Sequence, residues 1–257
     1  MPIHYARSLA GDDRSPSANR HLGVALAFIA GAINAGGFLA VRQYTSHMTG
    51  IVSSLADRLV LGEGALVLGA LGAILSFLLG AAATAVMVNY VRRQGLSCAY
   101  ALPLLLEAVL LLVFGVLGAR LAGIDAPVLP AVPLTVMLLC FIMGLQNAVI
   151  TKVSQAEIRT THMTGIVTDL GIELGKLMYW NADGGALRPK VLANRTRLAL
   201  LLSLLAAFLV GGLAGALGFK YLGYLSTVPL AAFLCLLAIV PAADEALRFL
   251  ARQRRGS

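Results

Sequence analysis

Six long apolar runs constrain what this chain can fold into more than any other feature. Each run is about 20 residues long, the length that a helix needs to cross the roughly 30 Å hydrocarbon core of a bilayer. Of its 257 residues, 59% are hydrophobic and only 12% are charged, whereas soluble domains carry about a quarter charged residues. A soluble fold is excluded, and the sequence predicts an all-α, multi-pass membrane protein. The six expected spans are 22–41, 65–91, 100–119, 132–150, 198–219 and 222–243.

The distribution of lysine and arginine predicts the orientation, because cytoplasmic loops of membrane proteins carry an excess of both. With a cytoplasmic N-terminus, 16 of the 20 basic residues fall on the cytoplasmic side. We therefore expect two cytoplasmic tails, a disordered one over 1–21 and a basic one over 244–257. The basic residues are dispersed at the ends of apolar runs, so the net charge of +8 does not indicate a nucleic-acid partner.

The chain contains an internal repeat. Gly-Ala-Ile-Asn-Ala at 31–35 resembles Gly-Leu-Gln-Asn-Ala at 144–148. Further on, Thr-Ser-His-Met-Thr-Gly-Ile-Val at 45–52 resembles Thr-Thr-His-Met-Thr-Gly-Ile-Val at 160–167. Two shorter matches follow in the same order in both halves. Four matches in one order indicate a duplication rather than chance.

The two repeats are residues 22–123 and 132–243, and each holds three expected spans. Because three is odd, the second copy enters the membrane from the opposite side, which relates the halves by a pseudo-two-fold axis in the membrane plane. Many secondary transporters are built from such inverted repeats and bind their substrates near the midplane, at the repeat interface. The predicted fold is therefore six transmembrane helices in two inverted three-helix repeats.

The second span of each repeat carries a small residue at every fourth position. Such a stripe lets a neighbouring helix backbone approach closely, so we expect it to pack the two repeats together, to accept Gly80→Ala and to reject Gly80→Leu. The stripes are Gly72, Ser76, Gly80 and Thr84 in the first copy, and Ser203, Ala207, Gly211 and Gly215 in the second.

A short amphipathic helix is predicted after each His-Met-Thr-Gly string, because apolar residues recur there at helical spacing. A helix of about 15 residues rises about 22 Å, enough to reach the midplane as a re-entrant half-helix. Two such N-termini, capped by the neighbouring threonines or serine, would face each other across a central cavity and favour an anionic or strongly dipolar group. The alternative is a helix lying flat on each membrane surface.

The candidate substrate-binding residues come from the repeated strings. The two histidines could form hydrogen bonds between the repeats, contact substrate or protons, or bind metal, although neither cysteine nor carboxylate stands at ligand spacing beside both. An asparagine without a partner is costly in an apolar span, so both should face the bundle interior, to hold helices or to touch substrate. These candidates are Asn34, His47, Thr49, Gly50, Asn147, His162, Thr164 and Gly165.

Glu107 is the carboxylate placed well inside an expected span, and its counterpart in the second repeat is Phe233. Burial in hydrocarbon disfavours a charged carboxylate, which suits a proton-coupling group. A neutral glutamic acid bonded to a neighbouring helix is the alternative. Asp57, Asp169 and Glu173 lie on the amphipathic helices and could instead be solvated at the helix ends.

The two repeated Asn-Ala and His-Met-Thr-Gly motifs make the chain resemble the YoaK-like family of uncharacterised bacterial integral membrane proteins. The resemblance covers about residues 20–245 and implies a bacterial plasma (inner) membrane location. The family has no agreed activity, so the resemblance adds no substrate and no catalytic residue.

The favoured function is a transporter or channel for a small solute or ion, with or without proton coupling, that works in the bilayer without a cofactor. One rival is an intramembrane enzyme that uses His47 or His162 as acid or base, although no nucleophile constellation accompanies them. Another is a scaffold or sensor, which the short tails disfavour. The substrate and the oligomeric state, a homo-oligomer included, stay open. Three scattered cysteines indicate neither a disulfide framework nor a zinc site.

Overall fold

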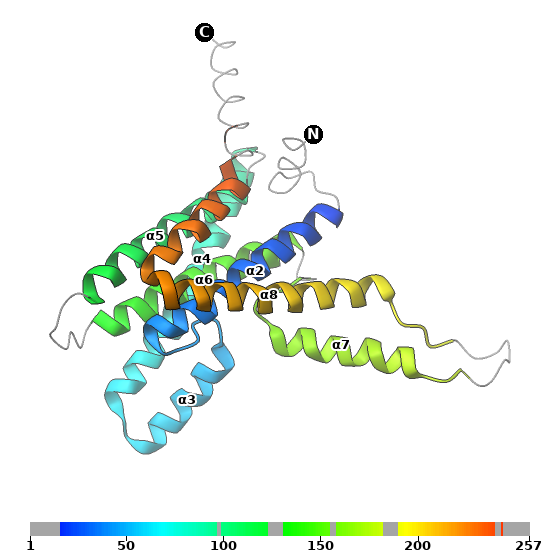
Figure 1. Ribbon diagram of the computed structural model, residues 1–257, viewed down its shortest axis with the longest axis horizontal. Coiled ribbons are helices and arrows are strands. Elements are labelled where there is room, and N and C mark those ends of the chain that lie inside the picture. Colours follow the sequence, from blue (N-terminus) through cyan, green and yellow to red (C-terminus); the bar gives the residue numbers. More distant parts are fainter. Residues whose placement is uncertain are drawn as a thin grey trace, which may run out of the picture.

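The computed structural model describes residues 16–96, 99–122, 131–154, 158–181, 190–239 and 243, and these residues form helices joined by loops. After α8, a single 3-10 turn, η1 (Gly223–Ser226), leads into a further helical segment over 227–239. Figure 1 shows the arrangement of α2 (Pro16–Val41), α3 (Met48–Leu61), α4 (Gly64–Arg93), α5 (Ala101–Ala122), α6 (Ala131–Val153), α7 (Met163–Met178) and α8 (Arg195–Leu222).

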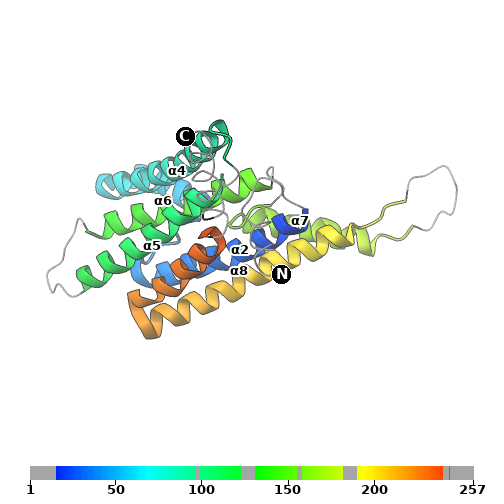
Figure 2. The same cartoon turned by 90° about the horizontal axis from the view of Figure 1, so that it is seen from above.

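Among the described residues, five helical stretches are long and apolar enough to cross a membrane: α2, α4, α5, α6 and the stretch 195–239. The prediction of an all-α protein with several membrane spans is thereby confirmed. The stretch 195–239 contains the fifth expected span and residues 222–239 of the sixth. Gly223 interrupts it with φ 59° and ψ −139°, a conformation that only glycine adopts readily. The chain turns sharply between α8 and the helical segment that follows it (Figures 1 and 2).

Helix α2 begins at Pro16 rather than at Leu22. The expected disordered tail is therefore wrong for residues 16–21, which are helical. Proline suits the first turn of a helix because its missing N–H has no partner there, and Ala18 is buried at 2% exposure. Residues 1–15 and the expected basic tail at 244–257 lie outside the described residues.

Helices α2 and α8 pack at backbone contact along much of their length. A Cβ added at Gly31 would overlap the carbonyl oxygen of Phe208, and one added at Gly211 would overlap that of Phe28. Further along both helices, a Cβ at Gly36 would meet the ring of Phe219. Later residues of α2 thus face later residues of α8, so the two helices run parallel.

Helices α4 and α6 form the same contact a second time. A Cβ at Gly144 would overlap the carbonyl oxygen of Phe77, and one at Gly80 would overlap that of Phe141. The hydroxyl of Thr84 donates a hydrogen bond to the carbonyl of Leu145 at 3.0 Å. The small-residue stripes therefore bring helices together as predicted, but the expected tolerance of Gly80→Ala is wrong, because a methyl group already meets backbone.

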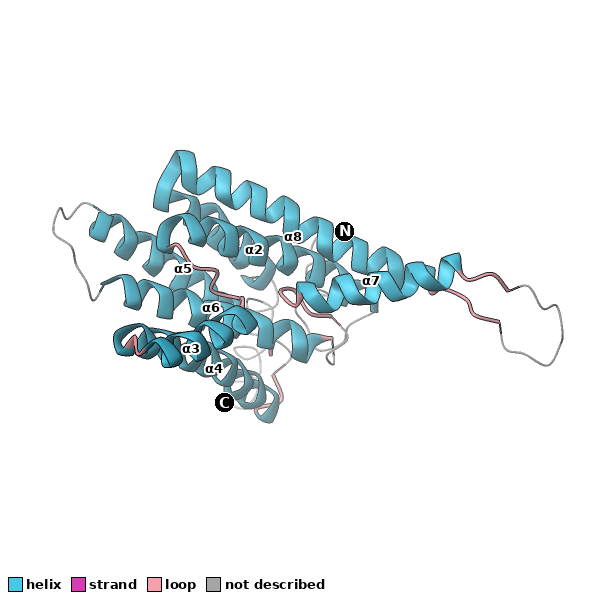
Figure 3. Cartoon of the chain, turned by 90° about the horizontal axis from the view of Figure 1, so that it is seen from below, coloured by secondary structure: helices cyan, strands magenta, loops and turns pink. Residues whose placement is uncertain are grey.

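Helices α3 and α7 each fold back along the next long helix, α3 against α4 and α7 against α8. Both run away from the middle of the molecule, in different directions (Figure 3). Their lengths, 14 and 16 residues, confirm the predicted amphipathic helices. Helix α5 packs on α6 and η1, which completes the bundle on the side away from α3 and α7.

Candidate functional site

Two asparagines fix the backbone that precedes the histidines. The Oδ1 atom of Asn34, on α2, accepts hydrogen bonds from the Ser46 hydroxyl at 2.9 Å and the Ser46 N–H at 3.2 Å. The Oδ1 atom of Asn147, on α6, accepts one from the Thr161 hydroxyl at 2.6 Å. Each asparagine therefore faces the interior, as expected, and ties the residue before a histidine to a long helix.

The histidines sit at the N-cap positions of α3 and α7 with nearly the same backbone conformation. His47 has φ −88° and ψ 69°, and His162 has φ −84° and ψ 60°. Neither N-cap side chain makes a capping hydrogen bond. The neighbouring threonines and serine were expected to cap, and that expectation is wrong because the histidines occupy the cap positions.

Each histidine ring lies over the glycine three residues later. A Cβ at Gly50 would lie 2.6 Å from Nδ1 of His47, and one at Gly165 would overlap Nδ1 of His162. The spacing in His-Met-Thr-Gly therefore has a steric cause. The ring folds back over the first turn of its own helix, and glycine leaves the space that it fills.

The two His-Met-Thr-Gly strings meet at one cavity of about 640 Å³. Six of the eight predicted substrate-binding residues line it: Asn34, His47, Thr49, Asn147, His162 and Thr164. The other two, Gly50 and Gly165, seat the histidine rings instead. The wall also contains Tyr44, Ser46, Met48, Thr151, Arg159, Thr161, Met163 and Phe208.

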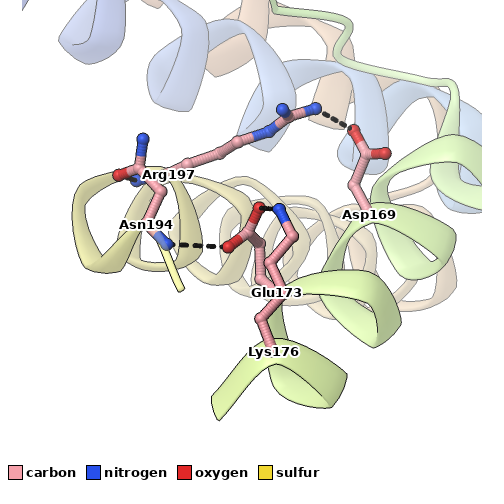
Figure 4. A network of polar contacts seen from close by, with 5 residues as sticks. All are labelled: Asp169, Glu173, Lys176, Asn194 and Arg197. Atoms are coloured by element: carbon pink, nitrogen blue, oxygen red, sulfur yellow. Dashed lines mark hydrogen bonds and ion pairs between the residues drawn. The ribbon is translucent and has the colours of Figure 1, made fainter. Parts of the chain in front are cut away.

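Helix α7 extends from this cavity to the start of α8, where a network of hydrogen bonds and ion pairs holds the two helices together (Figure 4). Arg197 contacts Asp169 at 2.8 Å. Glu173 accepts hydrogen bonds from the Lys176 ammonium and from the Asn194 N–H, both at 2.8 Å. Bonding to Lys176 and then to Asn194 lowers the pKa of the Glu173 carboxyl. Glu173 is buried at 2% exposure, which contradicts the alternative that it is solvated at the helix end.

The position of the cavity along α8 shows how far it lies from the start of that helix. Phe208, near the middle of α8, lines the cavity, whereas Asn194 precedes the first turn of α8. Fourteen residues separate them in the sequence, a rise of about 21 Å. Helix α7 thus runs from the middle of α8 to its start, the course expected of a re-entrant half-helix.

A second, smaller cavity of about 310 Å³ shares Tyr44 and His47 with the first. It lies between α3 and the neighbouring helices, and its wall includes Arg42, Arg58 and Ala70. Tyr44 and His47 therefore stand between the central cavity and the side of the bundle to which α3 extends.

Sequence reasoning missed Tyr44 and Arg159, which both line the central cavity. Each stands three residues before a histidine, so the two occupy equivalent positions in the repeat. Extending the repeat alignment by one residue would have pointed to them. The missed signal was a difference between the copies, an aromatic residue in one and a cation in the other.

Glu107 is fully buried on α5, and neither of its carboxyl oxygens has a hydrogen-bond partner among the described residues. It is not among the residues that line the central cavity. The structure therefore does not bring the predicted proton-coupling residue to the histidines.

Comparison with known proteins identifies the family. The chain belongs to the family described as "Protein of unknown function (DUF1275)", whose model matches residues 22–240, in agreement with the YoaK-like resemblance. No curated protein and no solved structure matches the chain.

Proposed function

We propose that this DUF1275 protein is a carrier or channel of the bacterial plasma membrane that moves a small solute through the cavity between its two His-Met-Thr-Gly strings. One observation carries the proposal. His47 and His162 are 115 residues apart in the sequence, yet both line the same cavity. Helices that lay flat on opposite membrane surfaces would keep these residues about a hydrocarbon thickness, roughly 30 Å, apart.

The helix pairing supports an inverted repeat. The first span of each half packs parallel to the second span of the other half, as α2 with α8 and α6 with α4. A two-fold axis in the membrane plane requires such an exchange. In this proposal α8 and the expected span 222–243, of which 227–239 is the described helical part, are two crossings joined at η1. Both termini lie in the cytoplasm, as the basic residues predict.

The half-helices supply a route on each side of the cavity. Helix α3 leads toward the outer face and α7 toward the cytoplasmic face, each beside a full-length helix. The second cavity at Tyr44 and His47 would form part of the outer route. If transport is coupled to protons, the histidines on the cavity wall are the coupling groups that the geometry favours, ahead of Glu107.

An intramembrane enzyme has less support. Among the described residues, the cavity wall carries neither cysteine nor carboxylate. Its serine, Ser46, donates its hydroxyl to Asn34 rather than to a histidine, so it is not placed as an activated nucleophile.

Thiol accessibility tests the proposal. In a background without Cys98, Cys140 and Cys235, we would introduce Thr49→Cys or Thr164→Cys. Both threonines line the cavity, and unlike Gly50 or Gly165 they seat no histidine ring. A water-filled transport site predicts that a small hydrophilic methanethiosulfonate reagent labels both positions in proteoliposomes.

The matched control is Leu75→Cys on α4, where the native side chain is 57% exposed on a helix that we place in lipid. A thiol surrounded by lipid stays protonated and reacts slowly. Labelling of Thr49→Cys and Thr164→Cys that is as slow as that of Leu75→Cys would overturn the proposal.

A further inference from the structure

We infer that the solute of the central cavity is a small organic anion, whose carboxylate binds Arg159 and whose apolar part packs against Tyr44 and Phe208. The inference rests on the proposed function for transport, but binding of the anion can be tested separately.

The charge of the cavity wall is the first step. Arg159, His47 and His162 line the cavity, and the described wall carries no carboxylate. Within the described part of the chain, Arg159 makes no ion pair. Arginine stays protonated in proteins, and the Arg159 side chain is exposed at the cavity. An anion that enters the cavity can therefore pair with it.

The backbone on both sides of Arg159 is anchored. The Ser154 hydroxyl accepts a hydrogen bond from the Ile158 N–H at 2.9 Å and lies 3.1 Å from the Ile158 carbonyl, to which it can donate. Ile158 is buried at 3% exposure and Thr160 is fully buried. The guanidinium therefore extends from a fixed segment, and a planar guanidinium suits two-point binding of a carboxylate.

The starts of α3 and α7 add to the preference for an anion. Met48 and Met163 are the first residues of these helices, and both line the cavity. The N–H groups of a first helical turn have no partner within the helix, and the helix dipole places partial positive charge there. Two such termini beside Arg159 favour negative charge over neutral or positive solutes.

Aromatic and methionine side chains give the cavity wall an apolar surface. Tyr44, in the position equivalent to Arg159, stacks on Phe38 with ring centroids 4.5 Å apart and planes 19° apart. Phe208 and the two methionines extend the apolar wall. A charged residue in one copy and an aromatic residue in the other fit an anion with one charged and one apolar end better than an inorganic ion.

Benzoate, benzyl alcohol and benzylamine form the test series, because they share the ring and differ in charge. Each would be titrated against purified full-length protein in detergent at pH 7, with thermal unfolding as the readout. We expect benzoate to raise the unfolding temperature, with little effect from the other two. Arg159→Gln should weaken benzoate binding about tenfold or more. Arg159→Lys should retain part of it, and Arg93→Gln, on the exposed end of α4, should leave it unchanged.

The outcomes separate this inference from the proposed function. Equal effects of the three compounds, or unchanged benzoate binding in a folded Arg159→Gln variant, would overturn the anion assignment even if the thiols at Thr49 and Thr164 are accessible. If Arg159→Gln does not fold, Tyr44→Ser provides the same test through the apolar end, and benzoate binding unchanged by it would contradict the inference. Arg159-dependent benzoate binding with inaccessible thiols would support the anion site and contradict transport.

Discussion

The segments 34–48 and 147–163, as far as the structure describes them, show what is shared by the two halves and what is not. Both contain an asparagine that accepts a hydroxyl hydrogen bond, and both contain a histidine seated on a glycine. They differ in charge at one pair of equivalent positions on the cavity wall, Tyr44 in the first half and Arg159 in the second, whereas Ser46 and Thr161 are both hydroxyl residues. The shared residues thus build the frame of the site, and the difference gives its two ends different chemistry.

The anchoring of the two half-helices also differs. Helix α7 is tied to the start of α8 through Asp169 and Glu173. Helix α3 turns directly into α4 through Gly62, at φ 72°, and Arg58 donates to the Leu66 carbonyl at 3.1 Å. The outer and inner halves of the proposed route are therefore held by different interactions, which mutations can separate.

The largest expected effect comes from the glycine contacts that both halves share. Gly80→Ala and Gly211→Ala should each destabilise the protein by about 3 kcal/mol, because the added methyl group meets a backbone carbonyl that cannot move cheaply. Loss of monodisperse protein in detergent, with lowered unfolding temperature, would be measured by size-exclusion chromatography and thermal scanning.

Gly69→Ala on α4 is the matched control, because a Cβ there meets no atom within 4 Å. Its free energy of unfolding should lie within about 1 kcal/mol of that of the wild type. If Gly80→Ala unfolds at the wild-type temperature while Gly211→Ala is strongly destabilised, the two contacts are not equivalent. The two-fold relation would then lose its main support.

Moving the histidine rings should have the next largest effect. Gly50→Ala and Gly165→Ala should displace His47 and His162 from their seats and reduce benzoate binding about tenfold, with little loss of folded protein. Gly171→Ala, on α7 in open space, should bind normally. Normal benzoate binding by both Gly50→Ala and Gly165→Ala would mean that the positions of the histidine rings do not matter to the site.

The asparagine contacts should give intermediate, matched effects. Double-mutant cycles of Asn34 with Ser46 and of Asn147 with Thr161, using alanine, should each yield a coupling of about 1 kcal/mol, typical of one hydrogen bond. Thermal unfolding in detergent provides the measurement. A coupling energy in one half and none in the other would show that the asparagine hydrogen bond stabilises only one of the two copies.

The smallest expected effect is confined to the α7 side. Hydrogen bonds from Lys176 and Asn194 lower the pKa of Glu173, so its stabilising contribution is complete above the unfolded value of about 4.3. It should be lost as the pH falls through the lower folded value. The unfolding temperature of wild type should therefore fall more steeply than that of Glu173→Gln below about pH 4; parallel profiles would contradict this role.

Much of the fold could be predicted because hydrocarbon imposes simple rules on length and composition. Apolar runs located the long helices, and the repeat located the two histidines that share the cavity. The start of α2 at Pro16 could not be read from polarity, because residues 16–21 are polar yet helical. The boundary between the expected spans 198–219 and 222–243, by contrast, lies beside the turn at Gly223.

Contacts that depend on three-dimensional packing were harder to predict. The small-residue stripes indicated close helices, but only the structure shows backbone so close that alanine cannot fit at Gly80. Glu107 was singled out by its charge in an apolar span, a signal that carries no information on which helix it faces. Arg159 was overlooked because it stands in a loop, where a basic residue is ordinary.

The distance between Thr49 and Thr164 tests the central claim most directly. Nitroxide labels at Thr49→Cys and Thr164→Cys, in the cysteine-free protein reconstituted in lipid, would be measured by pulsed electron resonance. The account predicts an intramolecular separation well below the roughly 30 Å thickness of the hydrocarbon core, because both residues line one cavity. A separation of about 30 Å or more would place the two helices on opposite membrane surfaces and contradict the shared site.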